Sequence, residues 1–206
     1  ETEREFSLWA SNKRACDATG MNNFYGLQQL ALISWLLSGD CIGLIKQYET
    51  TRLLPYSLRV HLIESDRIAT PNNYGAGTTL YYTTGKNSET GNTIYDGVEV
   101  DKNGMVVAYH IRSNYPYELG APVTEWARVL AYQQSTGLPN VLHVIDTERP
   151  DQYRGVSYLA QVIEPLLQLR RYTESELMAA VVESFYTAFI KTEAPTDEMP
   201  FNEVDP

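Results

Sequence analysis

The chain has 206 residues, of which 43% are hydrophobic and 20% are charged, as in an ordinary globular protein. It carries 16 basic and 26 acidic residues, and this net charge of -10 argues against a protein that coats nucleic acid by neutralising phosphates. Its two cysteines, Cys16 and Cys41, lack the spacing of a metal site and are too few for a disulfide scaffold. No uncharged apolar run reaches the roughly 18 residues that a membrane-spanning helix needs.

The N-terminal residues are mostly helical in pattern. In NNFYGLQQLALISWLLSGD, Asn22 or Asn23 can cap a helix whose apolar residues follow the helical period up to Leu37. Gly39 suits the left-handed residue that ends many helices. We expect this region to form a helical layer that covers a sheet.

Residues 40–148 have the composition of β-strands. CIGLIKQYE and SLRVHLIESDRI are rich in aliphatic residues and predict two neighbouring antiparallel strands. Between them and the later strands, residues 71–91 are dense in Gly, Asn, Thr and Ser and are interpreted as a long surface loop.

A β-hairpin is the clearest local signal. In GVEVDKNGMVVAYHI, Asp101 to Gly104 form a four-residue turn between two β-prone arms. WARVLAYQQ and NVLHVIDTE, on either side of TGLP, predict a further strand pair. Together these segments predict an α+β fold with one mostly antiparallel sheet of about five or six strands.

A long helical segment follows, from Arg154 to Glu193. Its last part, LMAAVVESFYTAFI, is apolar almost all the way round, and such a helix must be surrounded by other protein. As one helix of about 35 residues it would reach roughly 50 Å, beyond the body of a domain this size. Pro165 removes a backbone donor and predicts a kink.

A second interpretation starts a new helix within this segment. Thr173 and Glu176 fit a capping box, so the segment can also be two helices that fold back as a hairpin. The hairpin would cover its own apolar face and would suit a self-contained binding or scaffold module. A single helix would need neighbouring chains to cover it.

The search for catalytic chemistry is mostly negative. The sequence has no phosphate-binding glycine loop, dinucleotide fingerprint, nucleophile elbow or paired-histidine zinc motif. His61, His110 and His143 lie in strands among apolar residues and are interpreted as structural. Glu99 and Asp101 share a strand face, but next to a turn we expect them to be solvated. We predict no catalytic residue, metal or cofactor; a hydrolase using a carboxylate pair or His143 is the less favoured alternative.

Four motifs in order resemble the lambda family of tailed-phage portal proteins. They are IESDRI at 63–68, DGVEVDKNGMVVAYHI at 96–111, VLHVIDTERPDQYRGVSYLAQVI at 141–163 and LQLRRYTESELMAAVV at 167–182. The upstream segment WASNKRACDATGMNNFYGLQQLALISWLLSGD is also similar to that family, so the resemblance covers about residues 9–190.

The resemblance implies a structural function. Portal subunits form a closed ring of about twelve, a dodecamer, at one vertex of the capsid, and double-stranded DNA passes through the ring without sequence specificity. By this resemblance, residues 1–153 form a wing, residues 154–193 a stem helix, and residues 194–206 an acidic, proline-containing tail at the start of the clip. The chain is then a fragment without the rest of the clip, the second stem helix and the crown.

The resemblance also implies partners, a location and residue roles. The partners are identical subunits, terminase, head-completion proteins and the capsid; the location is the virion, and the host cytoplasm during assembly. Leu177, Val181, Phe185 and Phe189 repeat every four residues, and we predict that they pack between subunits. The basic residues expected to face the channel or a neighbour are Arg170, Arg171 and Lys191. Arg154 and Gly155 are expected to set the turn from wing to stem, with Gly155 adopting a backbone geometry that other residues resist.

Overall fold

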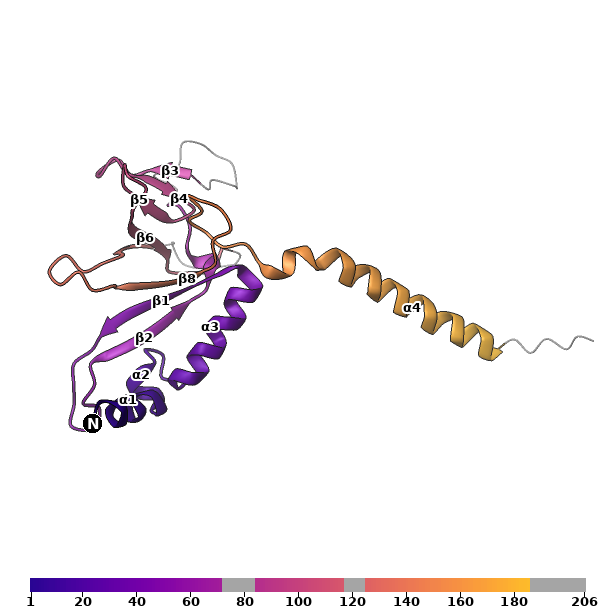
Figure 1. Ribbon diagram of the computed structural model, residues 1–206, viewed down its shortest axis with the longest axis horizontal. Coiled ribbons are helices and arrows are strands. Elements are labelled where there is room, and N and C mark those ends of the chain that lie inside the picture. The colour runs from indigo at the N-terminus through magenta and orange to yellow at the C-terminus, as the bar shows by residue number, and fades with distance from the viewer. Residues whose placement is uncertain (72–83, 117–124, 186–206) are drawn as a thin grey trace, which may run out of the picture. The chain divides into compact units, whose positions relative to one another are not determined.

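The computed structural model describes residues 1–71, 84–116 and 125–185 (Figure 1). The chain divides into two compact units, Glu1–Gln161 and Val162–Pro206. The first unit contains helices and antiparallel strands, and the second contains a single described helix, so the predicted α+β fold is confirmed. Among the described helices, none combines the length and the hydrophobicity that crossing a bilayer requires.

The N-terminal helices are α1 (Thr2–Ser11), α2 (Lys13–Cys16) and α3 (Phe24–Ser38). The side chain of Asn23 accepts a hydrogen bond from the backbone of Gly26 at 2.8 Å, which caps α3. At the other end, Gly39 is left-handed, with a φ of 91°, and its amide donates to Trp35. Both predicted ends of this helix are confirmed.

The strands form two separate antiparallel sheets. One has the order β2-β1-β8, and the other has the order β3-β4-β5-β6-β7. The strand bounds are β1 (Asp40–Gln47), β2 (Leu58–Ile63), β3 (Thr84–Lys86), β4 (Thr93–Tyr95), β5 (Val98–Val100), β6 (Val106–Arg112), β7 (Trp126–Leu130) and β8 (Val141–Ile145). The predicted pairing of β1 with β2 and the predicted hairpin of β5 with β6 are both present.

The predicted single sheet is wrong. β7 pairs with β6 along Trp126–Leu130, whereas β8 pairs with β1, so the two strands expected to pair with each other lie in different sheets. The two segments still meet in a short hairpin beyond these strands, with a bridge between Tyr132 and Pro139 and a backbone hydrogen bond from Asn140 to Ala131 at 2.9 Å. Strand composition predicts that a segment is extended, but it does not specify which strand it joins.

The main core lies between the two sheets. Ile42, Leu44 and Ile63 of the three-stranded sheet pack in one buried cluster with Val98 and Ile111 of the five-stranded sheet. A second buried cluster joins the N-terminal helices to the other face of β2; its buried members are Trp9, Ala10, Ala15, Cys16 and Leu27. The helical layer on a sheet, as predicted, is therefore present (Figure 1).

The second unit contains α4 (Ile163–Phe185), a continuous helix of 23 residues. It begins two positions before Pro165, so the proline ring lies in the first turn, where no intrahelical donor is lost and the expected kink has no cause. Thr173 lies within the helix and its hydroxyl donates to the carbonyl of Arg170. The interpretation with a new helix at Thr173, and with it the helical hairpin, is wrong.

Candidate functional site at Arg154

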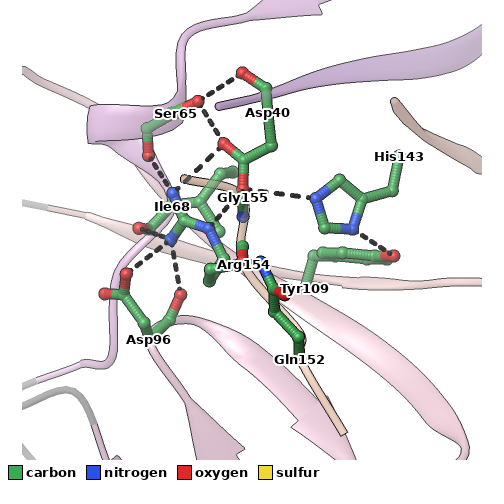
Figure 2. Close-up of polar contacts among 9 residues, drawn as sticks. All are labelled: Asp40, Ser65, Ile68, Asp96, Tyr109, His143, Gln152, Arg154 and Gly155. Atoms are coloured by element: carbon green, nitrogen blue, oxygen red, sulfur yellow. Dashed lines mark hydrogen bonds and ion pairs between the residues drawn. The ribbon is translucent and has the colours of Figure 1, made fainter. Parts of the chain in front are cut away.

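Arg154 is the centre of a dense polar cluster (Figure 2). Its Nε donates to Asp40 Oδ2 at 2.7 Å, and its Nη1 donates to the carboxylate and the carbonyl of Asp96 at 2.9 and 2.7 Å. Further bonds run from Nη1 to the carbonyl of Ile68 and from Nη2 to the carbonyl of Ser65, at 2.9 and 3.1 Å. We call Asp40, Ser65, Asp96, Arg154 and Gly155 the Arg154 cluster.

Distant parts of the sequence position these groups. Asp40 opens β1 directly after Gly39 ends α3, and Ser65 opens the 3-10 helix η1 (Ser65–Arg67), where its hydroxyl donates to the Asp40 carboxylate. Asp96 lies in the turn between β4 and β5 and has a positive φ of 44°, which is uncommon for a residue other than glycine. Arg154 thus ties the first strand, η1 and the β4–β5 turn together.

Gly155 lies in contact with Gly39. Its amide donates to Asp40 Oδ2 at 3.0 Å, and a Cβ added to Gly155 would overlap the carbonyl group of Gly39. Gly155 is not among the described residues with positive φ, so the reason given above for this glycine, an unusual backbone geometry, is wrong. The site needs glycine there because two backbones approach closely.

His143 extends the cluster on the other side of Asp40. Its Nε2 lies 3.4 Å from Asp40 Oδ2, and the hydroxyl of Tyr109 lies 3.4 Å from its Nδ1 (Figure 2). Burial, followed by the neighbouring Tyr132 and Asp40, raises the pKa of Tyr109 to about 12, so its hydroxyl stays protonated at neutral pH. Each ring nitrogen of His143 therefore lies within reach of one neighbouring side chain, Asp40 on one side and Tyr109 on the other.

Electrostatics hold Asp40 in its charged form. Its side chain is 1% exposed, and burial alone would raise its pKa. Hydrogen bonds from His143 and Arg154, and the charge of Arg154, outweigh burial and hold the pKa of Asp40 well below the ordinary 3.8. For Asp96 burial dominates, and its pKa is raised despite the charge of Arg154.

The residues after Arg154 are fixed to the same unit. The hydroxyl of Ser157 donates to the carbonyl of Leu36 at 3.2 Å, and the ring of Tyr158 packs on Trp35 with centroids 5.1 Å apart. Tyr158 opens the 3-10 helix η2 (Tyr158–Gln161), which ends the first unit. The segment that leads toward α4 is therefore bound to the end of α3.

Another buried polar cluster, separate from the Arg154 cluster, surrounds Glu99 on β5. The carboxylate accepts two hydrogen bonds from Arg128, at 2.8 and 3.0 Å, and lies 3.1 Å from Nε2 of His110. Its remaining donors come from the loop between β3 and β4, and they are Asn87, Thr90 and Asn92. The prediction that Glu99 is solvated is wrong: it is fully buried, because partners from two other strands and a loop replace its water.

The buried carboxylates of Asp40 and Glu99 predict that the folded protein becomes less stable at low pH. Burial would raise the pKa of Glu99, but the bonds from Arg128 and its other donors hold it below the ordinary 4.5. Because the native pKa values of Asp40 and Glu99 lie below their unfolded values, their stabilisation is fully present above about pH 5. It begins to be lost as the pH falls through the ordinary values of 4.5 and 3.8, and the loss continues until the pH reaches the lower native values. Urea unfolding should show a free energy of unfolding that is nearly constant from pH 6 to about pH 5 and then falls as the pH is lowered to 3.

A matched pair of variants tests the contribution of Glu99. Glu99→Gln should lower the stability at pH 6 and flatten its dependence on pH. Glu89→Gln, at an exposed glutamate in the neighbouring loop, should leave the slope unchanged. A wild-type stability that stays constant from pH 6 to pH 3 would contradict the assignment.

The other predicted site residues lie on α4. Leu177, Val181 and Phe185 are exposed, Phe185 by 80%, and no residue of α4 is buried. Arg170 forms an exposed ion pair with Glu174 one turn on, at 2.9 Å, and Arg171 is exposed. The remaining predicted residues, Phe189 and Lys191, lie outside the described residues.

Sequence reasoning found Arg154 and Gly155 but missed their partners. One feature of the sequence could have indicated that Asp40 is buried. It lies between a helix-ending glycine and an aliphatic strand, where a solvated charge is not expected. No feature of the sequence indicated Asp96 or Ser65, since their roles depend on which strands lie side by side. The polar groups of the Arg154 cluster bond to one another and connect distant segments of the α+β unit.

Comparison with known proteins identifies the family. "Phage portal protein, lambda family" matches residues 1–205, and the chain belongs to this family of structural capsid proteins. The portal protein of Escherichia phage N15 is 24% identical over 157 residues, which are 76% of this chain and 26% of that protein. The probable portal protein of Halomonas phage phiHAP-1 is 26% identical over 204 residues, 98% of this chain and 35% of that protein. The chain thus spans about a third or less of the length of these relatives.

Proposed function

We propose that this chain supplies the wing and the first stem helix of a portal subunit that assembles with identical copies into a closed ring at a capsid vertex. The family match over residues 1–205 supports the portal assignment. In the proposal, residues 1–153 act as the wing, residues 154–193 as the stem segment, and residues 194–206 as the start of the clip. Double-stranded DNA passes through the ring without sequence-specific contacts.

The apolar surface of α4 is the observation that supports the ring. Leu177, Met178 and Phe185 are 67%, 62% and 80% exposed, and none of the 23 residues of the helix is buried. Large apolar side chains rarely remain in water on one helix in such number, because burying each is worth about 1.5 to 3 kcal/mol. In a closed ring the neighbouring copies cover these side chains without leaving an uncovered end.

The Arg154 cluster has a mechanical role in this proposal. Arg154 and Gly155 are the wing-to-stem turn, and the buried ion pair with Asp40 fixes the start of the stem segment to the wing. A load on the stem would then pass into β1 and into η1 rather than bend a free linker. Arg170, Arg171 and Lys191 face the channel or a neighbour's carboxylate.

The partners and location of the whole protein also belong to the proposal. A subunit of this kind meets terminase during packaging, head-completion proteins afterwards, and the capsid shell throughout. It is part of the virion and is assembled in the host cytoplasm. Its function is structural, without catalytic residues or cofactors.

The mass of the assembled state tests the proposal. Light scattering on a sizing column, with negative-stain images of the main peak, should show rings of about a dozen subunits when the chain is extended through its native downstream sequence. A stable monomer of the extended chain would overturn the ring. A monomer of residues 1–206 alone would show that the downstream sequence drives assembly.

A substitution on α4 tests the packing between subunits. In the extended chain, Phe185→Asp should abolish rings, because a carboxylate would be buried in an apolar interface. Ser175→Asp adds the same charge on the polar part of the same helix, at an exposed position, and should leave rings intact. Rings that persist in Phe185→Asp would show that this face of α4 is not the interface.

A further inference from the structure

A cleft opens at one edge of the core between the two sheets. Its volume is about 330 Å³. The floor is apolar and includes Leu44, Ile63, Ile111 and Val129. The polar groups that line it are Lys46, His61, Arg67, Arg112, Ser113 and Glu125. We call this the inter-sheet cleft.

Positive charge gathers in the inter-sheet cleft although the chain as a whole is acidic. Three side chains that are positively charged at neutral pH, Lys46, Arg67 and Arg112, line it with one carboxylate, Glu125, whereas the whole chain has 16 Lys and Arg residues and 26 Asp and Glu residues. Within the described part of the chain, Lys46, Arg67 and Arg112 form no salt bridge. The cleft therefore holds basic groups whose charge the described residues leave unpaired.

The surrounding contacts hold these groups in place. Arg67 donates from Nε and Nη2 to the carbonyl of Arg112, at 3.0 and 2.9 Å, which fixes its guanidinium without neutralising it. The guanidinium of Arg112 lies over the ring of Trp126, 5.6 Å from its centre. Lys46 and His61 extend from β1 and β2, where Leu44 is the register partner of His61.

His61 carries a buried polar atom without a partner. Its Nδ1 is inaccessible to solvent and has no hydrogen bond among the described residues. Burial, followed by the charges of Lys46 and Arg67, lowers the pKa of His61, and Asp17 is the one group that raises it. Because this nitrogen is closed to solvent, a ligand in the cleft does not reach it, and the neutral imidazole contributes to the polar lining and not to the positive charge.

We propose that the inter-sheet cleft binds an acidic peptide segment of a partner protein. A carboxylate of that segment lies beside Lys46, and an apolar side chain next to it packs on the floor formed by Leu44 and Val129. The apolar floor favours a peptide, which can offer an apolar side chain beside its carboxylate, over a phosphate polymer. This inference does not depend on ring assembly.

A peptide titration tests the proposal on the full 206-residue chain. The probe is a fluorescein-labelled peptide of alternating glutamate and phenylalanine, followed by fluorescence anisotropy. Lys46→Gln should weaken its binding about tenfold, because one charge-assisted hydrogen bond is lost. Lys102→Gln removes the same charge from the exposed hairpin turn and should leave the affinity within twofold. Urea unfolding of both variants checks that they remain folded.

Three further outcomes decide between occupants. The same peptide with glutamine in place of glutamate should bind at least tenfold more weakly, and equal binding would overturn the role of the carboxylate. Equal weakening by Lys46→Gln and Lys102→Gln would show non-specific attraction and overturn the site. Inorganic phosphate or duplex DNA that displaces the peptide at lower concentrations than unlabelled peptide would also overturn the proposal, because the site would then be one for phosphate.

Discussion

Replacing Arg154 by methionine should lower the free energy of unfolding of the first unit by about 3 to 5 kcal/mol. Methionine keeps much of the apolar stem of the side chain but removes every donor that Arg154 offers to Asp40, Asp96, Ile68 and Ser65. The carboxylate of Asp40, 1% exposed, would be left without its cation. Urea unfolding at pH 7, followed by tryptophan fluorescence, measures the loss.

Two controls separate the ion pair from a general effect of removing a charge. Arg149→Met removes an arginine from the same segment at an exposed position and should change the stability by less than about 0.5 kcal/mol. Asp40→Asn should cost less in the Arg154→Met background than in the wild type, because the two residues share one interaction. Costs that add fully would show that Asp40 and Arg154 act independently.

Replacing Gly155 by alanine should destabilise the same unit by about 3 kcal/mol, although it adds a single methyl group. The new Cβ would overlap the carbonyl of Gly39, and a backbone atom cannot turn away as a flexible side chain can. This overlap is removed only if residues 155–156 move away from Gly39, and that movement weakens the hydrogen bond from the Gly155 amide to Asp40. Thermal and urea unfolding should both report the loss, and the Gly155 amide should exchange its hydrogen faster.

Gly43→Ala is the matched control for this variant. Gly43 is also a glycine without positive φ, and a Cβ built there would have its nearest neighbours at ordinary contact distance, 3.6 Å. It should cost less than about 1 kcal/mol. If Gly155→Ala were as stable as Gly43→Ala, the close approach to Gly39 would not limit the residue at position 155.

Arg154→Met and Gly155→Ala also test the proposed ring. Both weaken the attachment of the segment before α4 without touching α4 itself. If Arg154 and Gly155 are the wing-to-stem turn, the extended chain with either substitution should form rings of irregular diameter, visible in negative-stain images, while Arg149→Met rings stay uniform.

Local features of the fold could be predicted from the sequence alone. The cap at Asn23, the left-handed Gly39 and the turn from Asp101 to Gly104 all depend on residues within a few positions of one another. The ordered motifs also indicated the portal family, which the match to residues 1–205 confirms. In these cases the interacting groups are neighbours in the chain, so a short window of sequence contains the whole cause.

The tertiary structure alone decided which groups meet across long distances in the sequence. The segregation of β7 and β8 into two sheets follows from packing around the shared core, and no local pattern reports it. Glu99 looked like a solvated residue beside a turn, but Arg128 and His110 from β7 and β6 make its burial favourable. Gly155 was singled out for the wrong reason, because its constraint is the backbone of Gly39, 116 positions earlier in the sequence. Burial of a charge or a close backbone approach depends on partners that only the folded chain brings together.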